Sequence, residues 1–259
     1  MTRKYVNKYL FKTTDAINEE YRYFKCLELF SHPNLNKYCE PQIKGNVLYI
    51  YSNYIDGISL HDLITNTNIN AYVIKCILYQ ILIGLKYIHE NCWIHKNITS
   101  KSIMIDKDGT LKICHFLSKQ QENMNKTKNT FSGVIHYMSP EFIDDSNGYT
   151  IKTDIWSFGM IIIELLYGET LFYNYEPLKT MIKIINELCQ TQSIIEYIDN
   201  FFINKSKCTT EFDGIITKCL NKNPDERPSI DDILSYDCFA NLTIEESNEC
   251  LKKLINKNC

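Results

Sequence analysis

A polar turn between two apolar stretches carries the residues of this chain that are best placed to do chemistry. Residues 94–105 read as a short strand, a turn and a second strand. Asn97, Thr99 and Ser102 lie in the turn and offer one carboxamide and two hydroxyl groups. A carboxylate can accept a proton from an alcohol, whereas a carboxamide is not a useful base near neutral pH. The turn therefore sits where a catalytic loop could lie, but it has no evident base.

This stretch resembles the catalytic loop of the protein kinase family, which runs His-Arg-Asp-Leu-Lys-x-x-Asn between apolar strands. His95 stands at the place of the family's histidine. Asn97 replaces the catalytic aspartate, Thr99 the loop lysine, and Ser102 the asparagine that binds metal. The resemblance implies a loop that keeps its shape while these three positions are degenerate.

A further degenerate position follows the hairpin turn at 106–109. His115 stands where the family carries the aspartate of Asp-Phe-Gly, which holds Mg²⁺. Mg²⁺ prefers oxygen ligands in an octahedral arrangement, which an imidazole does not provide. Cys114 precedes His115, but no further ligand follows at a suitable spacing, so no metal site is predicted. Phe116 is kept, and the resemblance implies a packing role for it.

Later motifs match the family at positions that support the fold. The motif Tyr-Met-Ser-Pro-Glu ends at Glu141, and the motif Asp-Ile-Trp-Ser-Phe-Gly begins at Asp154. By resemblance, Asp154 hydrogen-bonds the backbone around His95, and Arg227 forms a buried, bidentate pair with Glu141. The residues predicted to be structural are His95, Phe116, Glu141, Asp154 and Arg227.

The elements that must position these residues begin with a strand over 4–12 and a following helix. By resemblance, Lys4 is the best candidate for the lysine that contacts the nucleotide. The position of the family's helix glutamate falls on Tyr23, and Glu19 or Glu20 is a less favoured substitute than simple loss. The family's Gly-rich phosphate loop would precede Met1, so we expect either a small lobe without its first two strands or a truncated sequence.

An apolar strand then leads to a segment that resembles the hinge between the two lobes. By resemblance, Ser52 is the gatekeeper and Asn53, Tyr54 and Ile55 form the hinge. Backbone groups at a hinge can bind an adenine edge whatever the side chains are, so the composition does not exclude weak, Mg²⁺-independent ATP binding. An ordinary linker between subdomains is the plainer alternative.

Helical periodicity is strongest over 70–91, and the stretch 154–168 is apolar nearly all round, which predicts a buried central helix. The polar stretch 118–129 is expected to be a surface loop at the place of the activation loop. Thr127 in this stretch and Thr130 directly after it are candidate phosphate acceptors, although threonine is common in loops. The tail over 243–259 reads as an amphipathic helix.

The composition limits the class of protein. With 259 residues, 44% hydrophobic content and few glycines and prolines, the chain is long and apolar enough for a proper core. A net charge of −3 gives no reason to expect nucleic acid or an anionic membrane as the main partner. Eleven cysteines without a Cys-x-x-Cys pair suit a reducing compartment, so a cytoplasmic or nuclear location is expected.

The predicted fold is α+β, namely a bilobal protein-kinase-like fold with a truncated, β-rich small lobe and a mainly helical large lobe. We expect the small lobe and hinge at 1–55, the large lobe at 56–240 and a helical tail at 241–259.

Three functions follow from the resemblance. The favoured one is a pseudokinase of Ser/Thr-kinase ancestry, a scaffold or allosteric regulator that needs no cofactor. Its expected partner is a protein, either an active kinase or a dimer mate, that contacts the small lobe at the exposed edge of its strand. One alternative is a divergent Ser/Thr kinase that uses relocated acids such as Asp106, Asp108 or Glu122. The other is a non-catalytic nucleotide sensor.

Overall fold

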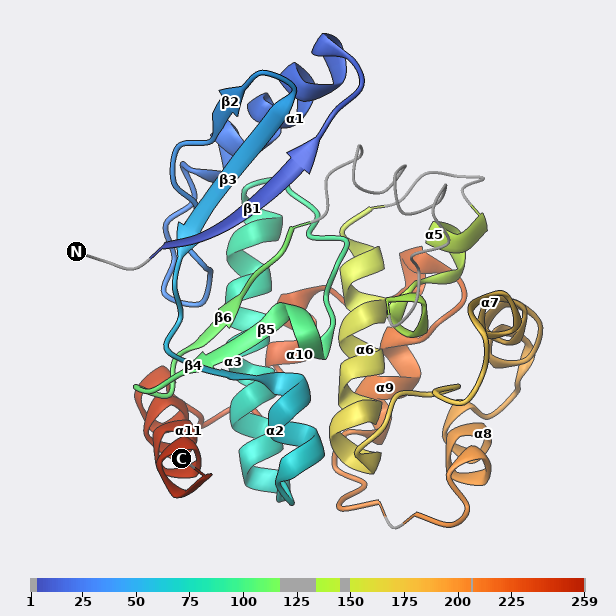
Figure 1. Ribbon diagram of the computed structural model, residues 1–259. Helices are drawn as coiled ribbons and strands as arrows, with labels where there is room; N and C mark the ends of the chain where they lie inside the picture. Colours follow the sequence, from blue (N-terminus) through green and yellow to red (C-terminus); the bar gives the residue numbers. More distant parts are fainter. Residues whose placement is uncertain (1–3, 117–133, 145–149, 206, 259) are drawn as a thin grey trace.

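A computed structural model describes residues 4–116, 134–144, 150–205 and 207–258. The small lobe contains the strands β1 (Lys4–Leu10), β2 (Gln42–Lys44) and β3 (Val47–Asn53) and the helix α1 (Thr14–Leu27). The sheet is antiparallel with the order β1-β3-β2 (Figure 1). The stretch 118–129, which contains Glu122 and Thr127, and the adjoining Thr130 lie outside the described residues.

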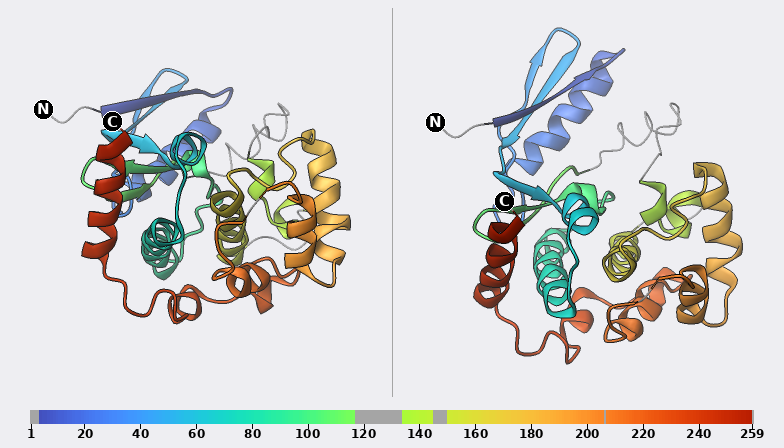
Figure 2. Two further views of the ribbon diagram at one scale, coloured as in Figure 1. Left: turned by 90° about the horizontal axis from the view of Figure 1, so that it is seen from below. Right: turned by 60° about the horizontal axis from the view of Figure 1, so that its bottom comes forward.

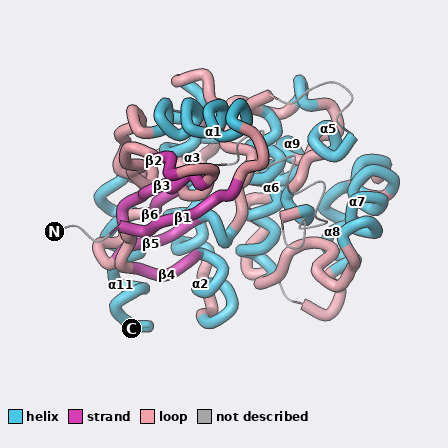
Figure 3. The backbone as a smooth tube through the Cα atoms, turned by 45° about the horizontal axis from the view of Figure 1, so that its top comes forward, coloured by secondary structure: helices cyan, strands magenta, loops and turns pink. Residues whose placement is uncertain are grey.

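The two faces of this sheet differ because side chains alternate along β3. Leu48, Ile50 and Ser52 are buried, whereas the residues between them are only partly covered. The helix α1 covers the buried face and contributes Phe24 and Leu27 to the core. Figure 3 shows α1 lying along one side of the three strands.

The large lobe is mainly helical and holds a second small sheet. Its strands β4 (Gly57–Ser59), β5 (Ile103–Asp106) and β6 (Leu111–Ile113) are antiparallel in that order. The longer helices are α3 (Ala71–Glu90), α6 (Lys152–Tyr167), α7 (Pro177–Asn186), α8 (Ile194–Phe201) and α11 (Ile244–Asn258). The shorter ones are α2 (Leu60–Asn66), α5 (Pro140–Asp144), α9 (Asp213–Cys219) and α10 (Ile230–Leu234).

Two helices form the centre of the large lobe. All described positions of α6 after its first residue are buried, as its nearly uniform apolar sequence predicts. The neighbouring α3 is long and apolar enough to cross a membrane by length and composition, but most of it is buried in the core. Figure 2 shows both helices enclosed by the others. This burial explains the apolar composition of α3 without a membrane.

The C-terminal helix is fixed to the large lobe by a buried polar junction. The Gln80 carboxamide on α3 donates to Ser247 Oγ on α11 and to the Gly109 carbonyl, both at 3.0 Å. Its oxygen accepts from Asn34 Nδ2 at 2.9 Å and from the Leu111 amide at 2.7 Å. The junction therefore connects the loop after α1, the β5–β6 turn and α11.

The predicted α+β, bilobal architecture is confirmed: a sheet with one helix lies above a mainly helical lobe (Figure 1). The predicted amphipathic tail is the helix α11. The lobe boundaries at 55 and 240 stay predictions.

Candidate functional site

The loop between α3 and β5 is held in place by a buried carboxylate. Asp154, in the first turn of α6, accepts from the His95 amide at 2.9 Å and from the Lys96 amide at 2.8 Å. His89 on α3 contacts the same carboxylate at 2.9 Å. Burial alone would raise the pKa of Asp154, but His89 and the loop amides lower it below its usual value. Asp154 is thus placed as the sequence predicted, and its role is to position the loop.

The His95 side chain is buried and has a fixed tautomer. Its Nδ1 accepts from the Asn97 amide at 3.2 Å, so its Nε2 carries the proton and donates to the Cys114 carbonyl at 3.0 Å. Burial lowers the pKa of His95 to about 4, and the ring packs on Phe116 with the two centroids 4.4 Å apart. A neutral, enclosed imidazole links the loop to the segment before Phe116.

Asn97 is engaged as a hydrogen-bond donor. Its side-chain amide donates to the His115 carbonyl at 2.8 Å. An ionised aspartate could not make this bond, because it has no proton to donate. His115 adopts a φ of 61°, a left-handed conformation that is uncommon for a residue with a side chain. The Asn97 side chain therefore stabilises the backbone of the other degenerate position, His115.

Thr99 and Ser102 form a reciprocal capping box around the 3₁₀ turn η1 (Ser100–Ser102). The Ser102 amide donates to Thr99 Oγ1 at 3.1 Å, and the Thr99 amide donates to Ser102 Oγ at 2.9 Å. Ser102 Oγ lies 2.6 Å from the Asn97 carbonyl oxygen and 2.9 Å from the Thr99 carbonyl oxygen. Its single hydroxyl proton is therefore directed at these backbone oxygens. Both side chains are buried, and their polar groups are used to shape the loop.

A cavity of about 420 Å³ brings together all four degenerate positions, namely Asn97, Thr99, Ser102 and His115. Glu164 on α6 also lines it. Within the described ranges, no cluster of three or more His, Cys, Asp or Glu side chains could hold a metal ion. By the resemblance, the residues that line the cavity stand at the place of the family's catalytic loop, with different functional groups.

Glu164 is the functional group of this cavity that sequence reasoning missed. Its two carboxylate oxygens accept from Ser100 Oγ at 2.8 Å and from the Tyr137 hydroxyl at 2.7 Å. Burial raises the pKa of Glu164 despite these bonds. The signal in the sequence was a single acid inside the otherwise apolar stretch 160–167, because a buried carboxylate requires polar partners.

Glu141 and Arg227 form the predicted bidentate pair. Arg227 Nη1 and Nη2 donate to the two oxygens of Glu141 at 2.6 and 2.8 Å. The guanidinium also donates to the Lys152 and Asn221 carbonyls and lies 5.0 Å from the ring centroid of Trp156. This pair ties α5 to the segment before α10.

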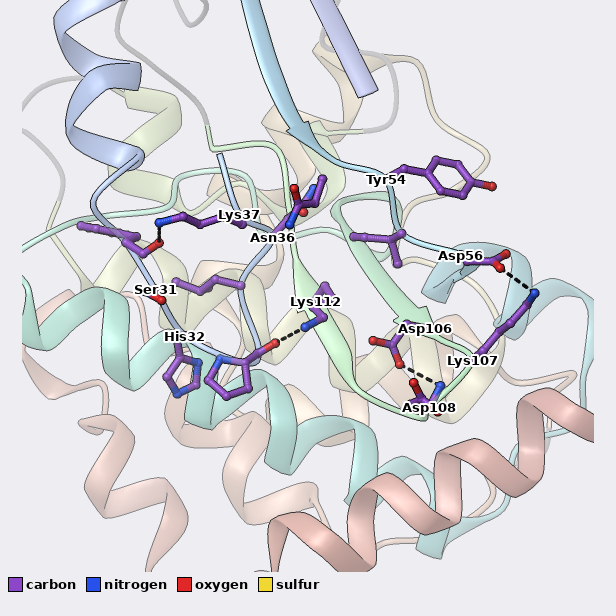
Figure 4. Close-up of a pocket in the computed structure, with 15 residues that line it drawn as sticks. Ser31, His32, Asn36, Lys37, Tyr54, Asp56, Asp106, Lys107, Asp108 and Lys112 are labelled. Carbon is purple, nitrogen blue, oxygen red and sulfur yellow. Dashed lines mark hydrogen bonds and ion pairs between the residues drawn. The ribbon is translucent and has the colours of Figure 1, made fainter. Parts of the chain in front are cut away.

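The predicted hinge residues line a different cavity from the degenerate loop. Asn53, Tyr54 and Ile55 border a cavity of about 780 Å³. Its other walls are the loop 30–37 and the turn at 106–108, and the four degenerate positions do not border it. Figure 4 shows this cavity with His32 and Lys37 on one side and Tyr54 on the other. The sequence predicted candidate nucleotide contacts at the hinge, and the structure places the hinge residues on this cavity, apart from the cavity that collects the degenerate positions.

Lys4 points away from the position that the resemblance assigned to it. It is exposed and pairs with Asn53, so it shares the poorly covered face of the sheet. The face that contacts α1 receives Tyr5, Asn7 and Tyr9, which lie opposite Ser52, Ile50 and Leu48. Opposite residues in an antiparallel pair share a face, so Asn7, and not Lys4, has the orientation that a lysine facing α1 would need.

Among the described residues, no ion pair joins Lys4 to the helix α1. Tyr23 packs against Trp93 with centroids 5.1 Å apart. Glu20 is buried, and together with burial its charge raises the pKa of Tyr9 on the inner face of β1. Glu20 of α1 therefore lies close to Tyr9, whereas Lys4 lies on the opposite face of the sheet.

Comparison with known proteins identifies the family. The model of the protein kinase domain matches residues 1–239. A mitogen-activated protein kinase kinase kinase 3 of Arabidopsis thaliana is 28% identical over 84% of this chain and 34% of its own length. The serine/threonine-protein kinase dst4 of Dictyostelium discoideum is 32% identical over 87% of this chain and 45% of its own length.

A third relative, the serine/threonine-protein kinase BCK1/SLK1/SSP31 of Saccharomyces cerevisiae, is 27% identical over 97% of this chain and 17% of its own length. The chain thus spans less than half the length of each of these relatives. Because the family model matches nearly all of the chain, the chain belongs to the protein kinase domain family.

Proposed function

We propose that this kinase domain is a pseudokinase, which acts by binding as a scaffold or allosteric regulator in phosphorylation signalling. The observation that carries the proposal is the cavity that holds Asn97, Thr99, Ser102 and His115. Each of the first three side chains is hydrogen-bonded within the loop or to the backbone of His115. Phosphoryl transfer depends on positioning and on charge neutralisation by metal and lysine. The carboxamide and the two hydroxyl groups are not useful bases near neutral pH, and the His115 imidazole is a poor ligand for Mg²⁺.

The residues at the family's metal positions do not fit Mg²⁺. Mg²⁺ needs several hard oxygen ligands, whereas His115 presents an imidazole and the Ser102 hydroxyl faces backbone carbonyls. The carboxylates at the rim of the cavity are also engaged. Glu164 accepts two hydroxyl groups, and Glu169 pairs with Lys205 at 2.9 Å.

The rival proposal, a divergent kinase with relocated acids, receives less support from the geometry. Asp106 and Asp108 border the hinge-side cavity and not the one around Asn97. Asp106 Oδ1 also accepts two hydrogen bonds within its own turn, from the Asp108 amide at 3.0 Å and from the Thr110 amide at 2.9 Å. Asp108 pairs with Lys252 on α11 at 3.2 Å, so both acids already have partners at or beside their own turn.

Radiolabelled phosphoryl transfer tests the proposal. The chain is incubated with γ-labelled ATP and Mg²⁺ or Mn²⁺, alone and with a generic basic protein substrate, beside an active kinase domain. We expect no transfer above background, and no change in Asn97→Ala or His115→Ala. Transfer at an ordinary enzymatic rate that either substitution abolishes would contradict the proposal.

Nucleotide binding and partner binding are separate parts of the proposal. We expect ATP to bind weakly if at all, with the same small shift in melting temperature in Mg²⁺ and in EDTA. A large shift that requires Mg²⁺ would favour the nucleotide sensor. The partner is proposed to be an active kinase or a second copy that contacts the small lobe, where β1 is the terminal strand of its sheet. A cytoplasmic or nuclear location stays a prediction.

A further inference from the structure

The contact between α3 and α11 brings two cysteines together. Figures 1 and 2 show α11 lying against α3. Ser247 Oγ donates to the Cys76 carbonyl at 2.9 Å, so a short side chain of α11 reaches the backbone of α3 at this point. Cys250 follows Ser247 by three residues and therefore lies on the same face of α11, one turn further along. The side chains of Cys76 and Cys250 are hydrogen-bonded to each other, which places two thiols side by side in this contact.

The buried polar junction around Gln80 fixes the register of this contact. Gln80 donates to Ser247 at 3.0 Å, and both side chains are buried. One turn earlier on α3 lies Cys76, and one turn later on α11 lies Cys250. The two helices therefore run in opposite directions past each other. Because a buried hydrogen bond is costly to break, the junction keeps the two thiols opposite each other.

The two thiols differ in their access to solvent. Cys76 is fully buried, whereas Cys250 is partly exposed. Burial, followed by the neighbouring Cys250, raises the pKa of the Cys76 thiol. A buried thiol of raised pKa reacts slowly with an oxidant, because the thiolate is the reactive form and the oxidant must reach it. Cys250 can therefore meet an oxidant first, with Cys76 in place as the resolving thiol.

We propose that Cys76 and Cys250 form a disulfide in response to hydrogen peroxide, which joins α11 covalently to α3. The Cys250 thiolate attacks one oxygen of the peroxide, the O–O bond breaks, and sulfenic acid and water are formed with the proton of the thiol. The Cys76 sulfur then attacks the sulfenic sulfur. The S–S bond forms, the S–O bond breaks, and the hydroxide leaves as water with the proton of Cys76. The two thiols lose two electrons, which reduce one peroxide to two waters.

The bond would fix more than the helix itself. A disulfide between positions 76 and 250 closes most of the large lobe into one loop, and long loops give the largest stabilisation in the chain-entropy account. The helix α11 also contacts the β5–β6 turn, where Lys252 pairs with Asp108 at 3.2 Å. This turn borders the hinge-side cavity. In the reducing compartment that the sequence predicts, such a bond forms transiently, as in redox sensing. The inference goes beyond the proposed function and does not depend on it.

Mapping of disulfides after peroxide treatment tests the inference on the whole chain. The folded protein is treated with hydrogen peroxide, its remaining thiols are blocked with N-ethylmaleimide, and it is digested without reduction for mass spectrometry. The main linked pair should contain Cys76 and Cys250, with a mass about 2 Da below the sum of the two free peptides, since two hydrogen atoms are lost. Dithiothreitol should separate the pair. The exposed thiols of Cys26, Cys92 and Cys208 serve as internal comparisons.

Two matched variants show whether the link acts on α11. In the wild type, peroxide should raise the melting temperature by about 5 °C or more, because the link restricts the unfolded chain. Cys250→Ser should abolish both the link and this rise. Cys26→Ser removes a more exposed thiol on α1 and should keep both. Without peroxide, both variants should melt close to the wild type, which shows that folded proteins are compared.

Several outcomes would overturn the inference. One is that Cys76 is still alkylated by N-ethylmaleimide after unfolding of the peroxide-treated protein. Others are a main link from Cys250 to a different cysteine, and a linked wild type that melts no higher than the reduced one. A rise in melting temperature that persists in Cys250→Ser would also overturn it. Should this variant not fold, the linked pair mapped in the wild type still decides the question.

Discussion

Replacing Arg227 by methionine should destabilise the large lobe more than any surface substitution. The guanidinium is 1% exposed and makes two bonds to Glu141 and two to backbone carbonyls. Methionine has a similar length and can keep the contact with Trp156, but it leaves the Glu141 carboxylate without its cation. The Lys152 and Asn221 carbonyls lose a donor as well.

The magnitude follows from breaking a buried pair on one side only. Such a loss costs about 3–5 kcal/mol, because the remaining charge stays desolvated and uncompensated. A domain of this size loses about 2–4 °C in melting temperature per kcal/mol, so the expected fall is about 6–20 °C. Burial alone would raise the pKa of Glu141, and the bond from Arg227 holds it lowered. The difference between wild type and variant should therefore shrink at acid pH, where Glu141 becomes protonated.

Urea and thermal unfolding of two Arg227 variants and a control measure this effect. Arg227→Lys keeps the charge but not the planar, two-pronged donor group of arginine. Its loss of unfolding free energy should therefore lie between zero and that of Arg227→Met. Lys218→Met, at an exposed lysine over the Tyr236 ring, controls for removal of a cation near an aromatic ring. If Arg227→Met costs less than about 1 kcal/mol, or Arg227→Lys costs no more than Lys218→Met, the pair does not have the role assigned to it. Should Arg227→Met not fold, Arg227→Lys still decides the question.

Three other substitutions or conditions give distinct outcomes. Asn97→Asp should destabilise by about 1–2 kcal/mol at pH 7 without producing phosphoryl transfer, because a carboxylate cannot donate to the His115 carbonyl; a stabilised or active variant in the same unfolding and transfer assays would refute this. Since burial lowers the pKa of His95 from 6.5 to about 4, the unfolded chain binds the proton more readily between these values, so its contribution to stability is complete above pH 6.5 and is lost as the pH falls. Urea unfolding should show a loss of about 2 kcal/mol from this group between pH 7 and pH 5, and a flat profile would count against it. Gly109→Ala should cost at least about 3 kcal/mol, because φ is +80° and the new methyl carbon would lie 2.0 Å from a backbone oxygen of α11. Gly45→Ala, at φ +60° with nothing within 4 Å, should cost only about 1 kcal/mol by thermal unfolding, and equal losses at the two glycines would exclude the clash.

Much of the fold could be predicted from the sequence because its signals are local. The nearly uniform apolar stretch of α6 predicted a buried helix, and the alternation over residues 4–12 predicted the strand that is β1. The motif that ends in Glu141 and the motif that contains Arg227 lie 86 residues apart, and the expected pair between them is present. These features depend on periodicity and on motif order, which a single sequence carries.

The orientation of site residues was less accessible to sequence reasoning. Lys4 has the right residue type near the right place, but the register with Asn53 turns it to the sheet face that α1 does not cover. A shift of one residue along a strand reverses the face, and motif spacing does not resolve such a shift when the strand is short. Glu164 was visible as an isolated acid, but its bonds to Ser100 and Tyr137 come from segments that are distant in the sequence.

The sequence alone determined which chemical groups this kinase domain has at its degenerate positions, since residue type is independent of folding. It thereby decided that a carboxamide and an imidazole stand where the family has two carboxylates. Only the tertiary structure decided what these groups do: Asn97 donates to the backbone of His115, and Ser102 caps its own turn. It also gathered the four degenerate positions and Glu164 around one cavity. The physical reason is that the direction of a side chain depends on register, backbone conformation and partners contributed by remote segments, and these exist only in the packed chain.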